Sequence, residues 1–426
     1  MNKKTFIYLA SLFIVLGIVG LLYWYFFMNA PATTNQGQGT TETGGFQPFG
    51  RTGSGSGTAS TTGSMNQPDL TNWTPGSPFH LPTLRLLSST PVGGYGVMDN
   101  ASTTVVRWVD RGRGNVYEAT YDSPLINTLS NTIVPRIYAS AWNADLTSFI
   151  ASLFQSGDTE PSTVFASLNS QATSSDASVT PYELRGKNLP NNVITYAVSP
   201  KRDRLFMLTT DTNGNGVGYI SNLDGSKTVV LFSTPLTQVN VSWPTDNAIL
   251  VVTKGIASEN GFAYLVNAKT GLWNRILGPL PGLSATISHD GKYAFLSASA
   301  EGGGVLSAIY SLSAGTSTDA VIKTLADKCA WGNYQKDTIY CAVPAGQTTS
   351  TYPDDWYTGK SSGIDKIWQV DAPTGRVTLV TSLVDHADRI IDAFNLSLDA
   401  KDHYLFFMNK NDLSLWSLDL SASGNN

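Results

Sequence analysis

Apolar and polar residues alternate in short segments along most of the chain, and the segments end at glycine, asparagine, aspartate or proline. Such segments are typical of β-strands, and no stretch of the main domain keeps the period of about 3.6 residues that marks an amphipathic helix. One unit recurs: a semi-apolar strand, a polar turn with Asp or Asn, then a strongly apolar strand. Tyr196–Leu208 and Val241–Val252 are two copies. The pattern predicts an all-β domain built from an internal repeat.

The polar turns of this repeat lie 44, 57, 44, 45, 44 and 65 residues apart. Inserts at Asn169–Thr180 and Ala345–Ser362 account for the two longer intervals. Four strands in about 40–45 residues form one blade of a β-propeller. The sequence therefore predicts a seven-bladed propeller over residues 81–426. Six and eight blades are the alternatives, because the first copy is weak. The turns are centred on Asp99, Asn143, Pro200, Pro244, His289, Asn333 and Leu398.

Both ends of this domain predict how the ring closes. After Leu413–Leu418 the chain continues only as a polar tail, so the last blade lacks one strand. Thr83–Ser88, just before the first blade, is a spare strand. We expect it to complete the last blade, which leaves no open edge there.

The N-terminal segment predicts a membrane anchor. Lys3 and Lys4 precede Thr5–Phe27, which are 23 residues without a charge. As a helix this segment spans about 35 Å, enough to cross the hydrocarbon layer. A cleaved signal peptide is the alternative, but its apolar region is usually only about 7–15 residues long. We expect residues 1–4 in the cytoplasm, an uncleaved signal-anchor at 5–27 and everything beyond it outside the cell.

Residues 28–80 are rich in glycine, serine, threonine and asparagine and contain few residues that could be buried in a core. Such a segment loses much conformational entropy on ordering and gains little burial in return. We predict a flexible linker between the anchor and the propeller.

One blade also carries a recognisable motif. Residues 288–295 read SHDGKYAF, which resembles the S-P-D-G-K element of the WD40-like (PD40) repeats in TolB-type bacterial propellers. The other blades keep only fragments, such as NAD at 143–145 and PTD at 244–246. The resemblance covers residues 81–420 as architecture and implies the propeller fold. TolB-like proteins are soluble and carry an extra N-terminal domain, whereas this chain is predicted to have an anchor and a linker.

Composition and motifs narrow the range of functions that the sequence allows. Only 14% of residues are charged and the net charge is -5, which argues against nucleic acid because phosphates need a concentrated basic surface. The sequence shows no sialidase box and no paired metal-binding histidine motif. Charge and motifs together favour a binding protein over an enzyme.

Asp211–Gly216 read DTNGNG, which matches the start of a calcium-binding loop. Oxygens of Asp211, Asn213 and Asn215 would then surround the cation, with Asp211 as the only carboxylate. The alternative is a plain hairpin turn, for which Asn-Gly dipeptides are well suited. We therefore expect no cofactor other than weakly bound Ca²⁺.

Cys329 and Cys341 lie on consecutive predicted strands of one blade, and they are the only cysteines. Cross-strand neighbours can reach the separation of a disulfide, and an extracytoplasmic location would favour the bond. The alternative is two buried free thiols.

The longest insert contains Tyr352, Asp354, Asp355, Trp356 and Tyr357. Aromatic side chains on a projecting loop are typical anchors of a binding interface. Alternatively, Trp356 folds back to plug the central channel or to cover a neighbouring blade. We name these five residues as the candidate binding site.

These observations predict a single-pass membrane protein whose extracytoplasmic propeller binds a protein or glycan at the cell envelope. The rival is a propeller enzyme, glycosidase- or lyase-like, with paired carboxylates of perturbed pKa in the central funnel. Asp392 is the main candidate for such a carboxylate. A third alternative is a purely structural component of the envelope.

Overall fold

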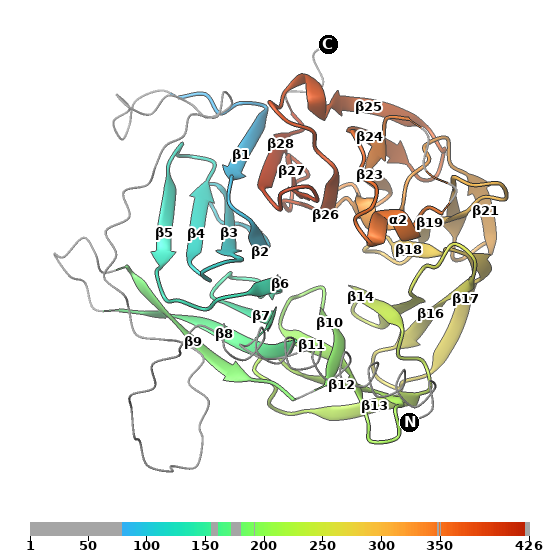
Figure 1. The fold of residues 1–426 in the computed structure, drawn as a ribbon, viewed down its shortest axis with the longest axis horizontal. Helices are drawn as coiled ribbons and strands as arrows, with labels where there is room; N and C mark the ends of the chain where they lie inside the picture. The colour runs from blue at the N-terminus through green and yellow to red at the C-terminus, as the bar shows by residue number, and fades with distance from the viewer. Residues whose placement is uncertain are drawn as a thin grey trace, which may run out of the picture. The chain divides into compact units, whose positions relative to one another are not determined.

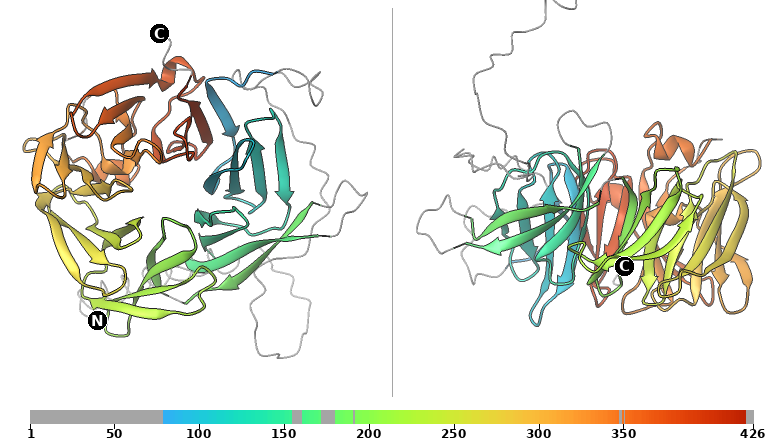
Figure 2. Two further views of the ribbon diagram at one scale, coloured as in Figure 1. Left: turned by 180° about the vertical axis from the view of Figure 1, so that it is seen from behind. Right: turned by 90° about the horizontal axis from the view of Figure 1, so that it is seen from below.

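The computed structural model describes residues 79–154, 161–171, 180–190, 192–346, 349 and 351–421. In this part of the chain, 28 β-strands form seven antiparallel sheets of four strands each. The sheets follow one another around a ring, which is seen along its axis in Figure 1 and from behind and from the side in Figure 2. The fold is a seven-bladed β-propeller, so the fold class and the blade number predicted from the turn spacing are confirmed.

Each blade runs from an inner strand at the axis to an outer strand at the rim. Blade 1 contains β2 (Val92–Asp99), β3 (Thr104–Asp110), β4 (Val116–Thr120) and β5 (Ile126–Ser130). Blade 2 contains β6 (Ile137–Trp142), β7 (Ser148–Leu153), β8 (Ser162–Ser170) and β9 (Tyr182–Asn188). Blade 3 contains β10 (Val193–Val198), β11 (Arg204–Thr210), β12 (Gly216–Asn222) and β13 (Val229–Thr234). Blade 4 contains β14 (Val239–Thr245), β15 (Ala248–Thr253), β16 (Asn260–Asn267) and β17 (Trp273–Pro281).

The remaining blades follow the same order. Blade 5 contains β18 (Ser284–Ile287), β19 (Tyr293–Ser299), β20 (Val305–Ser311) and β21 (Thr316–Asp319). Blade 6 contains β22 (Cys329–Trp331), β23 (Thr338–Pro344), β24 (Asp365–Asp371) and β25 (Val377–Ser382). Blade 7 contains β26 (Ala393–Leu398), β27 (Tyr404–Asn409), β28 (Leu415–Asp419) and β1 (Leu84–Ser88). Three short helices are described: η1 (Ala326–Lys328), α2 (Asp354–Tyr357) and η2 (Leu383–Asp385).

The ring closes as the sequence predicted. Strand β1 comes from the N-terminal side of the domain and pairs antiparallel with β28, so that Leu84 lies opposite Leu418 and Leu86 opposite Trp416. These side chains are almost fully buried. Closure therefore joins the two ends of the domain by both backbone hydrogen bonds and apolar packing.

The second strand of each blade is strongly apolar because both of its faces are covered by neighbouring blades. Every residue of β7 is buried, for example. Buried apolar residues gather into clusters where one blade meets the next, and Trp142 and Phe149 contact each other in the cluster between blades 1 and 2. The core of the protein is thus a ring of interfaces between blades.

The inner strand of blade 1 is rich in glycine because it packs very closely on blade 2. A Cβ atom on Gly93 would lie 2.8 Å from Ile137, and one on Gly94 would lie 2.3 Å from the Ser140 hydroxyl oxygen. Gly94 also has a φ of 139°, which L-residues with side chains rarely adopt. A side chain at either position would push blades 1 and 2 apart.

The turn motif is kept by hydrogen bonding even where its sequence has diverged. The Ser288 hydroxyl accepts hydrogen bonds from the backbone N–H groups of Lys292 and Tyr293 and donates one to Asp290. In three other blades the residue at the first position likewise accepts from the N–H group five residues later: Asn143, Ser199 and Asp399. A short polar side chain is therefore enough to form the turn, which explains why only one blade matches the motif well.

Strand direction alternates within each blade, so loops between second and third strands share a face with the connections between blades. This face carries the insert between β23 and β24 and is termed the insert face. Loops between first and second strands, and between third and fourth strands, lie on the opposite face.

No helix in the described part of the chain is long and apolar enough to cross a membrane. The predicted anchor at 5–27 lies outside the described residues, as do residues 1–4 and most of the predicted linker.

Candidate functional site in the central funnel

A cavity of about 1260 Å³ opens at the centre of the insert face and is termed the funnel. Its wall is formed by the first residues of five inner strands, from blades 1, 2, 3, 4 and 7, by loops that follow second strands, and by the insert of blade 6. Aromatic, amide and cationic side chains share this wall. They include Tyr138, Tyr196, Gln238, Asn240, Lys254, Phe394, Asn395 and Lys410.

The insert folds back onto the funnel wall. Tyr352 and Trp356 are only 3% and 5% exposed, and they pack with Val305, Leu325 and Phe394. The Ser299 hydroxyl donates a hydrogen bond to the Tyr352 carbonyl oxygen at 3.1 Å. Of the two interpretations left open by the sequence, the structure shows the folded-back insert. Trp356 is therefore part of the funnel wall, Tyr352 is buried, and neither is an exposed anchor.

Trp356 is held in place by a buried carboxylate. Its indole N–H group lies 3.1 and 3.0 Å from the two oxygens of Asp392. The backbone N–H of Gly363 donates to the same carboxylate at 3.0 Å. Asp392, which immediately precedes β26, thus holds α2 through Trp356 and the chain just after the insert through Gly363.

Asp392 belongs to a buried ionic cluster with Lys328 and Asp365. The Lys328 ammonium group contacts Asp392 and lies 2.8 Å from Asp365 Oδ2, and all three side chains are 0% exposed. Asp365 also accepts a hydrogen bond from the Ala393 N–H group. Burial raises the pKa of Asp365 to about 6, with Lys328 opposing the shift and Asp392 adding to it. Lys328 and Asp365 were not singled out from the sequence.

This cluster bears directly on the enzyme alternative. That alternative expects two carboxylates of perturbed pKa facing the funnel. Asp365 and Asp392 are two neighbouring carboxylates, but no solvent reaches either side chain and Lys328 bridges them. In this arrangement the carboxylates hold the insert against blades 6 and 7 and have no open side for a substrate.

The other insert residues also form hydrogen bonds to groups of the protein itself. Asp354 accepts a hydrogen bond from the Ala257 N–H group at 2.9 Å, which ties α2 to a loop of blade 4. Asp355 accepts one from the Thr351 hydroxyl at 2.6 Å. The hydroxyl of Tyr357, which is 37% exposed, donates to Asp327 at 2.7 Å. Of the five predicted residues, Tyr357 therefore presents the most surface to the funnel.

Three cationic side chains, Arg111, Lys254 and Lys410, and two carboxylates line the funnel, which leaves an excess of one positive charge. Its two lining carboxylates, Asp327 and Asp354, already accept the hydrogen bonds given above. Lys254 is exposed and lies 3.3 Å from the Gln238 side-chain oxygen. Lys410 lies over the Trp356 ring, and burial lowers its pKa while Asp392 opposes that shift.

The DTNGNG segment forms the hairpin between β11 and β12. One oxygen of Asp211 accepts hydrogen bonds from the N–H groups of Asn213 and Asn215, each at 2.8 Å. These backbone hydrogen bonds lower the pKa of Asp211. Among the described residues, no group of three or more His, Cys, Asp or Glu is arranged to hold a metal ion. The Asp211 carboxylate stabilises the turn through these hydrogen bonds, and the Ca²⁺ site at Asp211, Asn213 and Asn215 stays a prediction.

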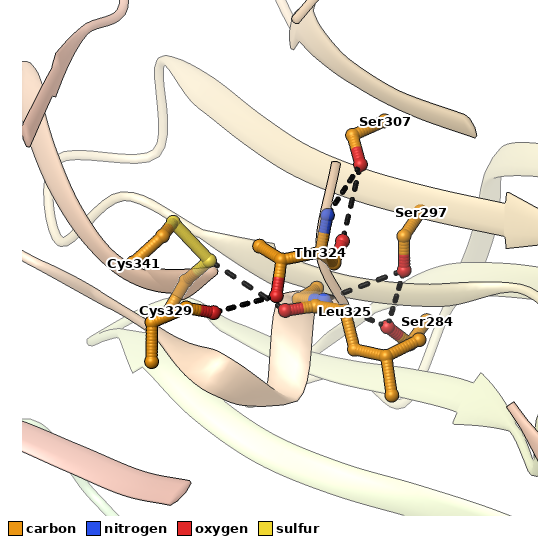
Figure 3. The surroundings of a disulfide bond; sticks show 9 residues. Ser284, Ser297, Ser307, Thr324, Leu325, Cys329 and Cys341 are labelled. Carbon is orange, nitrogen blue, oxygen red and sulfur yellow. Dashed lines mark hydrogen bonds between the residues drawn. A yellow bond between two sulfur atoms is a disulfide. The ribbon is translucent and has the colours of Figure 1, made fainter. Parts of the chain in front are cut away.

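Cys329 and Cys341 are joined by a disulfide between directly opposed residues of β22 and β23. Hydrogen bonds fix the preceding segment: the Thr324 hydroxyl donates to the Ala342 carbonyl, and the Ala326 N–H group donates to the Ser284 hydroxyl. Figure 3 shows this segment, with Ser307 bonded to Thr324 and Ser284 bonded to Ser297. These contacts hold η1, and with it Lys328 and Asp327, at the funnel wall. The disulfide is structural in this position.

No protein-family model matches the chain, and no curated protein matches it in sequence. Solved structures do match. Oligogalacturonate lyase from Vibrio parahaemolyticus aligns over 79% of this chain and 93% of its own, with 9% identity and a TM-score of 0.50. TolB from Acinetobacter baumannii aligns over 72% of this chain and 60% of its own, with 13% identity and a TM-score of 0.39.

A puromycin hydrolase also matches, over 75% of this chain and 50% of its own, with 13% identity and a TM-score of 0.48. The chain thus spans less than two thirds of TolB and half of the hydrolase. Identities this low carry information about the fold alone. The chain is a seven-bladed β-propeller, the fold that its resemblance to TolB-type repeats implied.

Proposed function

We propose that this protein is a binding module of the cell envelope that receives a protein or glycan partner at the funnel of its insert face. In this proposal the segment 5–27 anchors the chain in the membrane and the propeller acts outside the cell. The partner enters from the open side of the funnel and contacts the exposed ends of the inner strands.

The observation that carries this proposal is the composition of the funnel. It is a concave site large enough for a drug-sized group or a short chain segment. Its exposed side chains include Asn240, Asn395 and Lys254, with the aromatic rings of Tyr138 and Tyr196 beside them. Amides, ammonium groups and aromatic rings suit recognition by hydrogen bonding and stacking.

The buried ionic cluster supports binding over catalysis. A general acid or base must come within hydrogen-bond reach of the reacting group. Asp365 and Asp392 cannot do so while Lys328, Trp356 and the insert cover them. The similarity to a lyase and a hydrolase is one of fold and gives no residue of this chain a catalytic role.

The extracytoplasmic location has its own support. The disulfide between Cys329 and Cys341 is of a kind that persists in oxidising compartments. The apolar segment 5–27 and the two lysines before it favour an anchored protein with its C-terminal domain outside.

Two substitutions in one blade test the proposal. Asn240→Arg places a long cation in the funnel, at an exposed residue of β14. Asn247→Arg makes the same change at an exposed residue of the turn after β14, on the opposite face. Both variants should keep the wild-type midpoint of thermal unfolding, because neither side chain is in the core.

The measurement is crosslinking mass spectrometry in native membranes, with a glycan analysis of the crosslinked products. The proposal expects Asn240→Arg to lose a partner that wild type and Asn247→Arg both retain. Loss in Asn247→Arg alone would place the binding surface on the opposite face. A protein that crosslinks to nothing on either face, in either variant or wild type, would contradict the proposal and favour a structural envelope component.

A further inference from the structure

A second cavity lies beside the funnel, between blades 1 and 2 on the insert face. Its volume is about 890 Å³, and it shares Arg111 and Tyr138 with the funnel. Three arginines and three aromatic residues line it, together with Thr90, Pro91, Asp110 and Gly112. The arginine pocket, as it is termed below, is defined by Arg111, Arg113, Arg136, Tyr117, Tyr138 and Phe154.

The three arginines come from two separate loops and are held together by backbone hydrogen bonds. The Arg111 carbonyl oxygen accepts from the Ile137 N–H group at 3.1 Å, and the Arg113 carbonyl oxygen accepts from the Val134 N–H group at 2.6 Å. The Arg136 carbonyl oxygen accepts a hydrogen bond from the Phe154 N–H group at 3.2 Å. The loop after β3, the connection into β6 and the end of β7 therefore form one rigid rim. A preformed site of this kind loses little entropy on binding.

The lining of the pocket has an excess of positive charge, with three arginines and one carboxylate. Arg111 donates from Nη1 to the Tyr138 carbonyl oxygen at 3.2 Å. Arg113 and Arg136 are exposed, and no ion pair joins either guanidinium group to a described carboxylate. The one carboxylate in the lining, Asp110, already accepts from the Arg113 N–H group and the Thr90 hydroxyl.

The rest of the pocket is apolar. The rings of Tyr138 and Phe154 lie 5.4 Å apart, and Tyr117 stacks on the buried ring of Trp108 at 5.8 Å. Pro91 adds a further apolar side chain. Guanidinium groups therefore stand beside a surface that suits aliphatic or aromatic groups.

We propose that the arginine pocket binds an acidic peptide segment in which carboxylates alternate with apolar side chains. Guanidinium groups recognise carboxylates by paired, charge-assisted hydrogen bonds. A peptide fits better than a sugar chain, because sugar hydroxyls also need acceptors and the only carboxylate here is engaged. Arginine and aromatic residues are also enriched at protein interfaces. The inference deepens the proposed function, on which it rests, by naming the chemistry of the partner.

The test uses the full chain in detergent and a labelled peptide of alternating Glu and Leu. A second peptide carries Gln in place of every Glu. The pocket variant is Arg113→Gln with Arg136→Gln, and the matched control is Lys269→Gln with Arg376→Gln. The control removes the same charge from exposed turns of the opposite face. Thermal unfolding confirms that both variants are folded.

The Glu peptide should bind wild type about tenfold more tightly than the Gln peptide, and added salt should weaken it. The pocket variant should lose about tenfold in affinity for the Glu peptide, while the control binds as wild type does. Equal binding of both peptides, equal losses in both variants, or no binding would overturn the inference. So would a uronic-acid oligosaccharide that binds through these arginines when the Glu peptide does not.

Different results would refute the funnel proposal and the pocket inference. If the Glu peptide does not depend on Arg113 and Arg136 but Asn240→Arg still loses its native crosslinks, the pocket inference fails and the funnel proposal stands. If the Glu peptide depends on the arginines but the native crosslinks do not depend on Asn240, the funnel proposal fails and the pocket is a separate peptide site.

Discussion

Replacing Lys328 by methionine is expected to destabilise the propeller strongly. Methionine keeps much of the side-chain volume but removes the charge that separates Asp365 from Asp392. All three side chains are 0% exposed, so water cannot take the place of the ammonium group. Removing one partner of a buried ion pair typically costs about 3–5 kcal/mol of unfolding free energy. We expect a loss in this range at pH 7.5.

The loss of unfolding free energy in Lys328→Met should be larger at neutral pH than at acidic pH. In wild type, burial raises the pKa of Asp365 from 3.8 to about 6, so the folded protein binds a proton that the unfolded chain releases. The contribution of this carboxyl to the unfolding free energy is therefore fully present below about pH 4, and it is lost as the pH rises through about 6. Without Lys328 the folded-state pKa rises further. The variant should then be weakest at neutral pH and recover part of its stability near pH 5.

The assay is unfolding of the full chain in urea, followed by tryptophan fluorescence at pH 7.5 and at pH 5. Lys360→Met, at an exposed lysine of the insert, is the control and should stay within about 0.5 kcal/mol of wild type. Adding Asp365→Asn and Asp392→Asn to Lys328→Met should restore much of the stability, because no buried charge remains. A Lys328→Met protein within about 1 kcal/mol of wild type at pH 7.5, or one that acid does not help, would refute this reasoning.

Three further predictions concern the same fold. Replacing Cys329 and Cys341 by alanine should lower the unfolding free energy by about 3 kcal/mol, measured by urea unfolding, because the bond closes a short loop in the unfolded chain. Leu86→Ala should cost about 2–5 kcal/mol in the same assay, since this buried residue of β1 closes the ring; a wild-type midpoint would argue against closure through β1. Gly94→Ala should lower the thermal midpoint, because its Cβ would overlap Ser140, and an unchanged midpoint would show that blades 1 and 2 can separate freely.

The architecture was predictable because it is repeated. Seven turns recur at a nearly constant interval, and each repeat independently reports the same unit. Closure followed from counting strands, since Thr83–Ser88 had no blade of its own and the last blade lacked one strand. These features depend on local pattern, which a single sequence contains in full.

The site depends on contacts between residues that are far apart in the chain. A single sequence does not show which of these residues meet. Lys328 meets Asp392 across 64 positions of the chain, whereas the carboxylate next to it in sequence, Asp327, bonds to Tyr357 instead. The sequence singled out the insert residues but left open whether they project or fold back, because that choice depends on the Asp392 carboxylate that bonds to Trp356.

The arginine pocket was missed for a related reason. Counting charges over the whole chain gave a mildly acidic protein, and that average hides local clusters. Arg111, Arg113 and Arg136 meet because the loop after β3 bonds to the connection into β6.

The most direct test of the binding proposal is site-specific photo-crosslinking in living cells, with the reactive residue at position 240 or at position 247. These positions lie on β14 and in the turn that follows it, on opposite faces of one blade. The proposal predicts a discrete protein or glycan adduct from position 240 and none from position 247. Adducts from position 247 alone, or equal adducts from both positions, would contradict binding at the funnel.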